Sequence, residues 1–169
     1  MEQVQAALQA YFTDWNAWIE GKRDYDFASL KPMHAGWKVP DENALGIYIG
    51  EALTFTEQGH IGTVDNRKIA LLVLKQPVEN VPVLQVMQLR PGSTDTLGLD
   101  HVAFYCNNMS NLQEAIEVLP EKWERQSNPG HEWISLWFGP DKREVKFFDH
   151  TSLDLGAREL EQTSATIKS

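Results

Sequence analysis

The sequence contains a single cysteine, Cys106, among its 169 residues, which excludes an internal disulfide. Cys106 lies in an apolar, strand-like run, where a buried structural thiol is favoured over a nucleophile. No apolar run is long enough to cross a bilayer, because the longest, such as residues 69–74, fall far short of the roughly 20 residues required. Residues 1–5 are polar and lack the segments of a signal peptide. These absences predict a cytoplasmic protein without membrane association.

Clusters of basic residues are also missing. The formal net charge is -9, and the acidic residues are scattered, which disfavours nucleic acid as a partner. The sequence has no glycine-rich phosphate loop, Gly-x-Ser-x-Gly elbow or Cys-x-x-Cys motif, which argues against nucleotide-dependent and serine-hydrolase chemistry. With 42% hydrophobic and 23% charged residues, the composition is that of a soluble globular protein with a sizeable core. A small-molecule ligand stays possible as a partner, and the oligomeric state, monomer or homodimer, stays open.

Apolar residues spaced three and four apart predict an N-terminal helix over residues 3–20, ended by Gly21. The apolar stripe of this helix includes Trp15 and Trp18. Packing of the stripe on the sheet of the same chain is the preferred interpretation. A docking face for a partner protein is the alternative.

The remaining chain predicts the same order of elements twice, a strand, a helix and three strands. In the first set, Pro40 and Asp41 open the helix, and in the second Ser110 and Gln113 have the spacing of a capping box. The expected strands are residues 34–39, 61–64, 69–75 and 83–90, then 99–106, 123–127, 133–138 and 144–148. A short helix is expected at residues 153–160, followed by a frayed end.

The predicted fold class is α+β. Two βαβββ modules, residues 25–92 and 97–169, would form a curved eight-stranded mixed sheet around a cleft. An extra N-terminal helix, within residues 1–24, would pack on the sheet. The three parts together are expected to form one compact domain.

A histidine stands at the start of each predicted module, His34 in the first and His101 in the second. Two imidazoles are suited to hold a divalent transition metal. The alternative is that both are strand-end residues satisfied by hydrogen bonds. Asp100 either orients the His101 imidazole as a hydrogen-bond acceptor or simply ends the strand. The remaining histidines adjoin predicted turns and are expected to be solvated: His60, His131 and His150.

Several stretches in the right order resemble the vicinal-oxygen-chelate superfamily, which includes glyoxalase I and the extradiol dioxygenases. The stretches are residues 67–78, 83–92, 100–103 and 145–148. Within this superfamily the chain most resembles the YecM-type proteins. The resemblance implies paired βαβββ modules around a U-shaped cavity.

The resemblance also implies a divalent metal, Zn²⁺, Ni²⁺, Fe²⁺ or Mn²⁺, held by residues on the first and last strand of each module. The first-strand positions are His34 and His101. The last-strand position of the first module is Gln88, where YecM-type chains have a glutamate. The corresponding position of the second module is Phe148, which cannot bind a metal. Glu144 lies on the same strand face and would replace it if the register differs.

Trp37, Lys146 and Phe148 are expected to line the ligand pocket. The implied function is that of a metal-binding protein, or of a metal-dependent isomerase, lyase or dioxygenase, acting on a small oxygen-chelating molecule. Whether the protein is an enzyme stays open. One alternative is a metal-free ligand-binding protein that kept the fold but lost the ligand set. Another is an interaction protein that uses the N-terminal helix, which requires Trp15 and Trp18 to be exposed.

Overall fold

The computed structural model describes residues 1–64, 66–128, 131–149 and 165–168. The helices are α1 (Glu2–Ile19), α2 (Glu42–Ala52) and α3 (Met109–Glu117), with short 3₁₀ turns at Phe27–Ser29 and Leu53–Phe55. The strands are β1 (Lys31–Val39), β2 (Thr56–Val64), β3 (Arg67–Val78), β4 (Val81–Gln88), β5 (Gly98–Cys106), β6 (Trp123–Asn128), β7 (His131–Phe138), β8 (Arg143–Asp149) and β9 (Ala165–Lys168). None of these helices has the length and apolar character needed to span a membrane.

Side-chain caps determine where two of the helices begin. The Asp41 carboxylate accepts the N–H of Ala44 at 2.8 Å and caps α2, as the sequence predicts. The predicted capping box at Ser110 is wrong, because α3 begins at Met109 and Asn108 is its N-cap. The Asn108 side chain accepts the N–H of Asn111 at 3.0 Å, so Ser110 lies inside the first turn.

The described strands form one sheet in the order β6-β7-β8-β5-β1-β4-β3-β2-β9. Within each module the first strand lies parallel to the last, β1 beside β4 and β5 beside β8. The modules meet where β1 pairs antiparallel with β5, and we call this pairing the module junction. The predicted α+β fold with a mixed sheet of two βαβββ units is confirmed.

A ninth strand extends the sheet beyond the expected eight. β9 pairs antiparallel with β2, so the prediction that this end of the chain frays is wrong for residues 165–168. Without β9, β2 would present unpaired backbone groups at the sheet edge, and such groups readily bind another extended segment. The helix expected at residues 153–160 lies outside the described residues.

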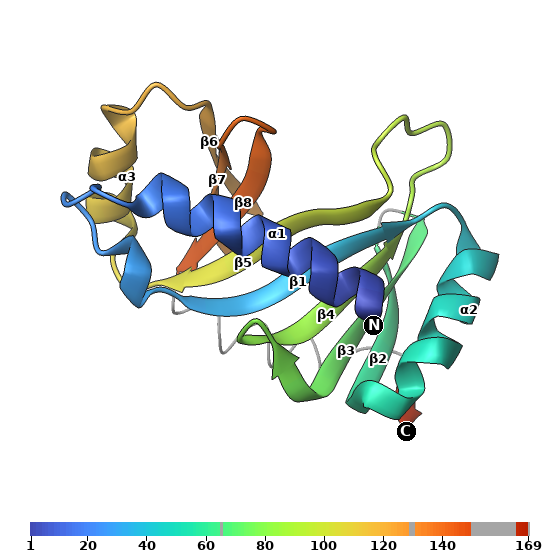
Figure 1. Cartoon of the computed structure of the whole chain (residues 1–169). Coiled ribbons are helices and arrows are strands. Elements are labelled where there is room, and N and C mark those ends of the chain that lie inside the picture. Colours follow the sequence, from blue (N-terminus) through green and yellow to red (C-terminus); the bar gives the residue numbers. More distant parts are fainter. Residues whose placement is uncertain (65, 129–130, 150–164, 169) are drawn as a thin grey trace.

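The N-terminal helix crosses the middle of the sheet (Figure 1) and packs on it with its aromatic stripe. Trp15 stacks on Phe104 of β5, with ring centres 5.2 Å apart. Only 3% of Trp15 and 9% of Trp18 is exposed. The predicted packing is therefore confirmed, and the alternative of an interaction protein with exposed Trp15 and Trp18 is wrong.

The two faces of the sheet have different roles. Ala35, Phe104 and Phe147 share one hydrophobic core with side chains of α1, α2 and α3, so the helices cover that face. Side chains alternate along a strand, which directs His34 and His101 to the opposite face. We call this opposite face the site face.

Candidate metal and ligand site

The two histidines that open the modules meet at the module junction. In the antiparallel pairing of β1 and β5, His34 lies opposite Ala103 and Gly36 lies opposite His101, so both imidazoles are on the site face. Their Nε2 atoms are 3.1 Å apart, and their ring planes are inclined by 80°. Only 8% of His34 and 2% of His101 is exposed. The structure brings together the two residues that the sequence pattern singled out.

Gly36 provides the space in which the His101 ring lies. A Cβ atom added to Gly36 would be 2.4 Å from Cε1 and 2.7 Å from Nδ1 of His101, closer than real Cβ contacts. The φ angle of Gly36 is not in the left-handed region. The glycine is therefore required here for close approach rather than for backbone conformation.

The outer nitrogen of His101 is held by a chain of charged groups. Asp100 Oδ2 lies 2.7 Å from His101 Nδ1, and Asp100 Oδ1 lies 2.8 Å from Lys38 Nζ. Lys38 Nζ in turn donates to Asp95 Oδ2 at 2.8 Å. A carboxylate can only accept, so Nδ1 carries the proton in neutral His101 and its Nε2 is an acceptor. In the pair, His34 therefore donates its Nε2–H to His101.

Burial keeps both imidazoles neutral. It lowers the pKa of His34 well below its ordinary value, and the charges of His101 and Lys146 act in the same direction. Burial also lowers the pKa of His101 to about 4, although the bond to Asp100 opposes it. For Asp100, burial favours a raised pKa, but His101 and Lys38 outweigh it and hold the pKa well below its ordinary value. Neutral imidazole is the form that binds metal ions.

Glu144 lies beside the pair on the site face. β8 runs parallel to β5, with Glu144 opposite His101. The Glu144 carboxylate accepts the hydroxyl of buried Ser135 at 3.1 Å, and Lys146 Nζ lies 3.9 Å away. Burial raises the pKa of Glu144, and Lys146 partly offsets the rise. This register places Glu144, rather than Phe148, opposite the second histidine.

The structure does not bring Gln88 or Trp37 to the histidine pair. Gln88 pairs with Val39, whose side chain belongs to the helix-covered core, and its amide oxygen accepts the Lys68 N–H at 3.2 Å. Trp37 stacks on Tyr48 of α2, with ring centres 6.2 Å apart. The physical reason is the two-residue period of a strand, which turns both side chains away from the site face.

Gln85 occupies the place that was predicted for Gln88. It lies opposite Gly36, which lies opposite His101, so Gln85 and His101 belong to one row across β4, β1 and β5. Alternation along β4 separates Gln85 and Met87 from Gln88. That alternation was readable in the sequence, but it does not indicate which of the two faces carries the histidines.

The same row continues through Leu71 of β3 to His60 of β2. His60 is 6% exposed, so the prediction that it is solvated is wrong. Its Nε2 is 3.0 Å from Gln58 Nε2, and its Nδ1 has no partner within the described ranges. His150 and the His131 side chain lie outside what the structure describes.

Aromatic rings lie along one side of the pair. The ring centre of Phe148 is 6.2 Å from that of His34, and Trp133 stacks on Phe148 at 5.7 Å with an interplanar angle of 25°. Lys146 Nζ lies 6.0 Å from the Trp133 ring centre. The expected pocket residues Phe148 and Lys146 are therefore near the pair. Trp133 was missed because its run of residues reads as a strand buried on both faces.

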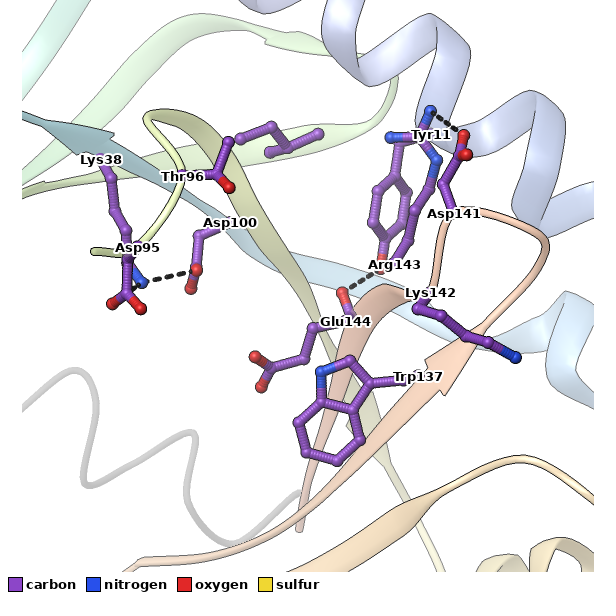
Figure 2. A pocket seen from close by; sticks show the side chains of 11 residues that line it. Tyr11, Lys38, Asp95, Thr96, Asp100, Trp137, Asp141, Lys142, Arg143 and Glu144 are labelled. Atoms are coloured by element: carbon purple, nitrogen blue, oxygen red, sulfur yellow. Dashed lines mark hydrogen bonds and ion pairs between the residues drawn. The ribbon is translucent and has the colours of Figure 1, made fainter. Parts of the chain in front are cut away.

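A cavity of about 350 Å³ lies at the end of the strands (Figure 2), and its lining residues do not include either histidine of the pair. Lys38 and Asp100 line one side of it, and Glu144 and Trp137 line the other. Asp100 bonds His101 and Glu144 lies opposite His101, so these two acids connect the cavity with the pair. The cavity has room for a small polar molecule.

The donor atoms fit part of a metal site. Imidazole nitrogens at 2.0–2.1 Å from one ion are about 2.9 Å apart at a right angle and about 3.4 Å apart at a tetrahedral angle. The observed 3.1 Å lies between these values. Asp100 supplies the carboxylate that typically orients a metal-binding histidine. Among the described residues no three His, Cys, Asp or Glu side chains are grouped to hold a metal, so a third ligand requires a side chain to move.

No family model and no curated protein matches the sequence. Among solved structures, a structural-genomics target titled Protein EC4020 has a TM-score of 0.68 and 11% identity, covering 94% of this chain and 92% of its own. A variant of methylmalonyl-CoA epimerase from Streptomyces coelicolor, in complex with 2-nitronate-propionyl-CoA, has a TM-score of 0.52 and 16% identity, covering 72% and 98%. The epimerase from Mycobacterium tuberculosis has a TM-score of 0.51 and 12% identity, covering 70% and 87%.

At these identities the likeness establishes the fold. Methylmalonyl-CoA epimerases are members of the vicinal-oxygen-chelate superfamily. The chain therefore has the paired βαβββ fold of that superfamily, with one histidine from each module at the junction.

Proposed function

We propose that this cytoplasmic protein binds a divalent metal ion between His34 and His101 and holds a small oxygen-chelating molecule on that ion. The observation that carries the proposal is the 3.1 Å separation of the two Nε2 atoms, with Nδ1 of His101 engaged by Asp100. The Nε2 lone pair of His101 faces His34 and accepts its Nε2–H, and a metal ion would replace that proton between the two rings. The relation to YecM-type proteins belongs to the same proposal and rests on the sequence stretches quoted above.

Glu144 is the proposed third ligand, and Gln85 replaces Gln88 as the fourth. Glu144 lies opposite His101, while Gln85 shares its row on the other side of Gly36. Two imidazoles with a carboxylate and an amide oxygen suit Zn²⁺, Ni²⁺, Fe²⁺ or Mn²⁺. When bound, such an ion supplies Lewis-acid polarisation of a ligand oxygen.

Among the reaction classes that the resemblance implies, isomerisation is the one to test first. Two solved structures with this fold are methylmalonyl-CoA epimerases. Burial raises the pKa of Glu144, which favours this carboxyl as a proton-exchanging group when it does not bind the ion.

One observation favours a metal-free ligand-binding protein as the second candidate. His34 and His101 already satisfy each other, and in the described part of the chain no third acidic, histidine or cysteine side chain is placed to hold a metal ion together with them. This candidate predicts that small ligands bind equally well after metal removal.

Elemental analysis by ICP-MS tests the proposal on protein purified without an affinity tag and offered Zn²⁺, Ni²⁺, Mn²⁺ and Fe²⁺. About one equivalent is expected in the wild type and none in a His34→Ala/His101→Ala variant. His60→Ala is the matched control, because it removes a buried imidazole from β2, away from the junction. Metal retained by the double variant, or absent from the wild type, contradicts the proposal.

A further inference from the structure

Two hydrogen-bond donors near the histidine pair lack an acceptor in the part of the chain that the structure describes. The closest carboxylate oxygen to Lys146 Nζ is on Glu144, at 3.9 Å, beyond hydrogen-bonding distance. Only 23% of the Lys146 side chain is exposed. The Nε1–H of Trp133 is buried and has no partner among the described residues. Because buried donors are normally paired, the indole N–H is suited to donate to a ligand oxygen. The partly exposed Lys146 ammonium, whose ion pair with Glu144 is long, is available to bind a second oxygen.

The sheet register places Lys146 on the same face as the histidines. Lys146 lies opposite Ala103 of β5, and Ala103 lies opposite His34 of β1. Ala103, which has a small side chain, is therefore the residue that separates Lys146 from His34 in this row. The charge of Lys146 lowers the pKa of both His34 and His101, in agreement with this proximity.

The chemistry of these donors defines the class of ligand. One ammonium and one indole N–H match the two oxygens of a single carboxylate, since both groups donate and neither accepts. Trp133 and Phe148 are stacked with an interplanar angle of 25°, so they present a flat apolar wall beside the ammonium. A neutral vicinal diol would leave the Lys146 charge with only the Glu144 carboxylate, 3.9 Å away, as its partner.

We propose that the ligand is a small 2-hydroxy or 2-oxo carboxylate. Its carboxylate receives Lys146 Nζ and the Nε1–H of Trp133, and its 2-oxygen faces His34 and His101. This assignment rests on the proposed function, because it names the molecule that would chelate the ion.

The test compares glycolate with ethylene glycol, which has the same two-carbon frame without the negative charge. Each is titrated into Co²⁺-loaded protein, and binding is followed by the visible absorption of the ion. The wild type is expected to bind glycolate more tightly, and Lys146→Met to weaken glycolate binding at least tenfold with little change for ethylene glycol. Lys146→Arg keeps the positive charge and should still bind glycolate more tightly than ethylene glycol. Lys75→Met is the matched control, because it removes an exposed lysine charge from β3.

Three results would overturn the assignment: unchanged glycolate binding by Lys146→Met, equal loss in Lys75→Met, or tighter binding of inorganic phosphate than of glycolate. If Co²⁺ does not bind, the proposed function fails, and a metal-free titration decides the inference separately. In that titration benzoate is added to EDTA-treated protein, and the NMR resonance of the Trp133 indole N–H is followed. This resonance is assigned by its absence from the spectrum of the Trp133→Phe variant. A shift that Lys146→Met abolishes supports the carboxylate site, and an unperturbed resonance overturns it.

Discussion

Replacing Gly36 with alanine tests whether this glycine is present to admit the His101 ring. The added methyl carbon would lie 2.4 Å from Cε1 and 2.7 Å from Nδ1 of His101. β1 is hydrogen-bonded on both sides, to β4 and to β5, so its backbone cannot easily move away. We therefore expect the imidazole to leave its position.

Displacing the ring breaks two hydrogen bonds. The bond from His101 to the Asp100 carboxylate is 2.7 Å long, and the bond between His34 and His101 is 3.1 Å long. A bond to a charged group contributes about 1.5–3 kcal/mol and a neutral bond about 0.5–1.5 kcal/mol. The Gly36→Ala variant should therefore lose about 2–4.5 kcal/mol of unfolding free energy.

Urea denaturation followed by circular dichroism measures this loss, with the m value expected to stay unchanged. Gly46→Ala is the control, because a Cβ at Gly46 has nothing within 4 Å in the exposed part of α2. Alanine is the better helix former, and this control should gain about 0.5–1 kcal/mol. A Gly36→Ala variant that is as stable as the wild type and still takes up metal would refute the role given to Gly36.

Three further predictions address the site and the core. The unfolding free energy of metal-free protein should fall by at least about 2 kcal/mol from pH 7.5 to pH 5, because the unfolded chain takes up a proton on His101 near pH 6.5 and the folded chain only near pH 4. Burial of His34 adds to the fall in the same direction. Urea titrations at both pH values measure the fall. An unfolding free energy that does not change with pH would contradict burial of the imidazoles in their neutral form. Asp100→Asn should weaken metal binding about 10–100-fold in competition with a chelator, and unchanged affinity would mean that Asp100 does not orient His101. Trp15→Ala should cost about 3–5 kcal/mol in the same urea assay, and a loss below about 1 kcal/mol would contradict the packing of α1 on the sheet.

Much of the fold could be predicted from local patterns. Alternating apolar residues indicated most strands, and the spacing of Trp15 and Trp18 indicated a helix with one buried face. The strand β9 could not be predicted in this way, because backbone pairing with an edge strand formed earlier in the chain requires no particular sequence signal.

The candidate site was only partly predictable. The pairing of His34 with His101 followed from the repeated element order, together with the resemblance. Register across the sheet is set by contacts between distant strands, so the sequence did not distinguish Gln85 from Gln88. The role of Gly36 likewise depends on a ring that comes from the other module.

The antiparallel pairing of β1 with β5 makes the histidine pair a property of the whole sheet. Each module contributes one imidazole, so neither module alone contains the binding atoms. A group that binds both Nε2 atoms therefore binds only chains in which the two modules are docked. By mass action it shifts the folding equilibrium toward the docked state, by RT ln(1 + [L]/Kd). Separately expressed modules would thus associate more completely when that group is present, because its binding stabilises the docked state.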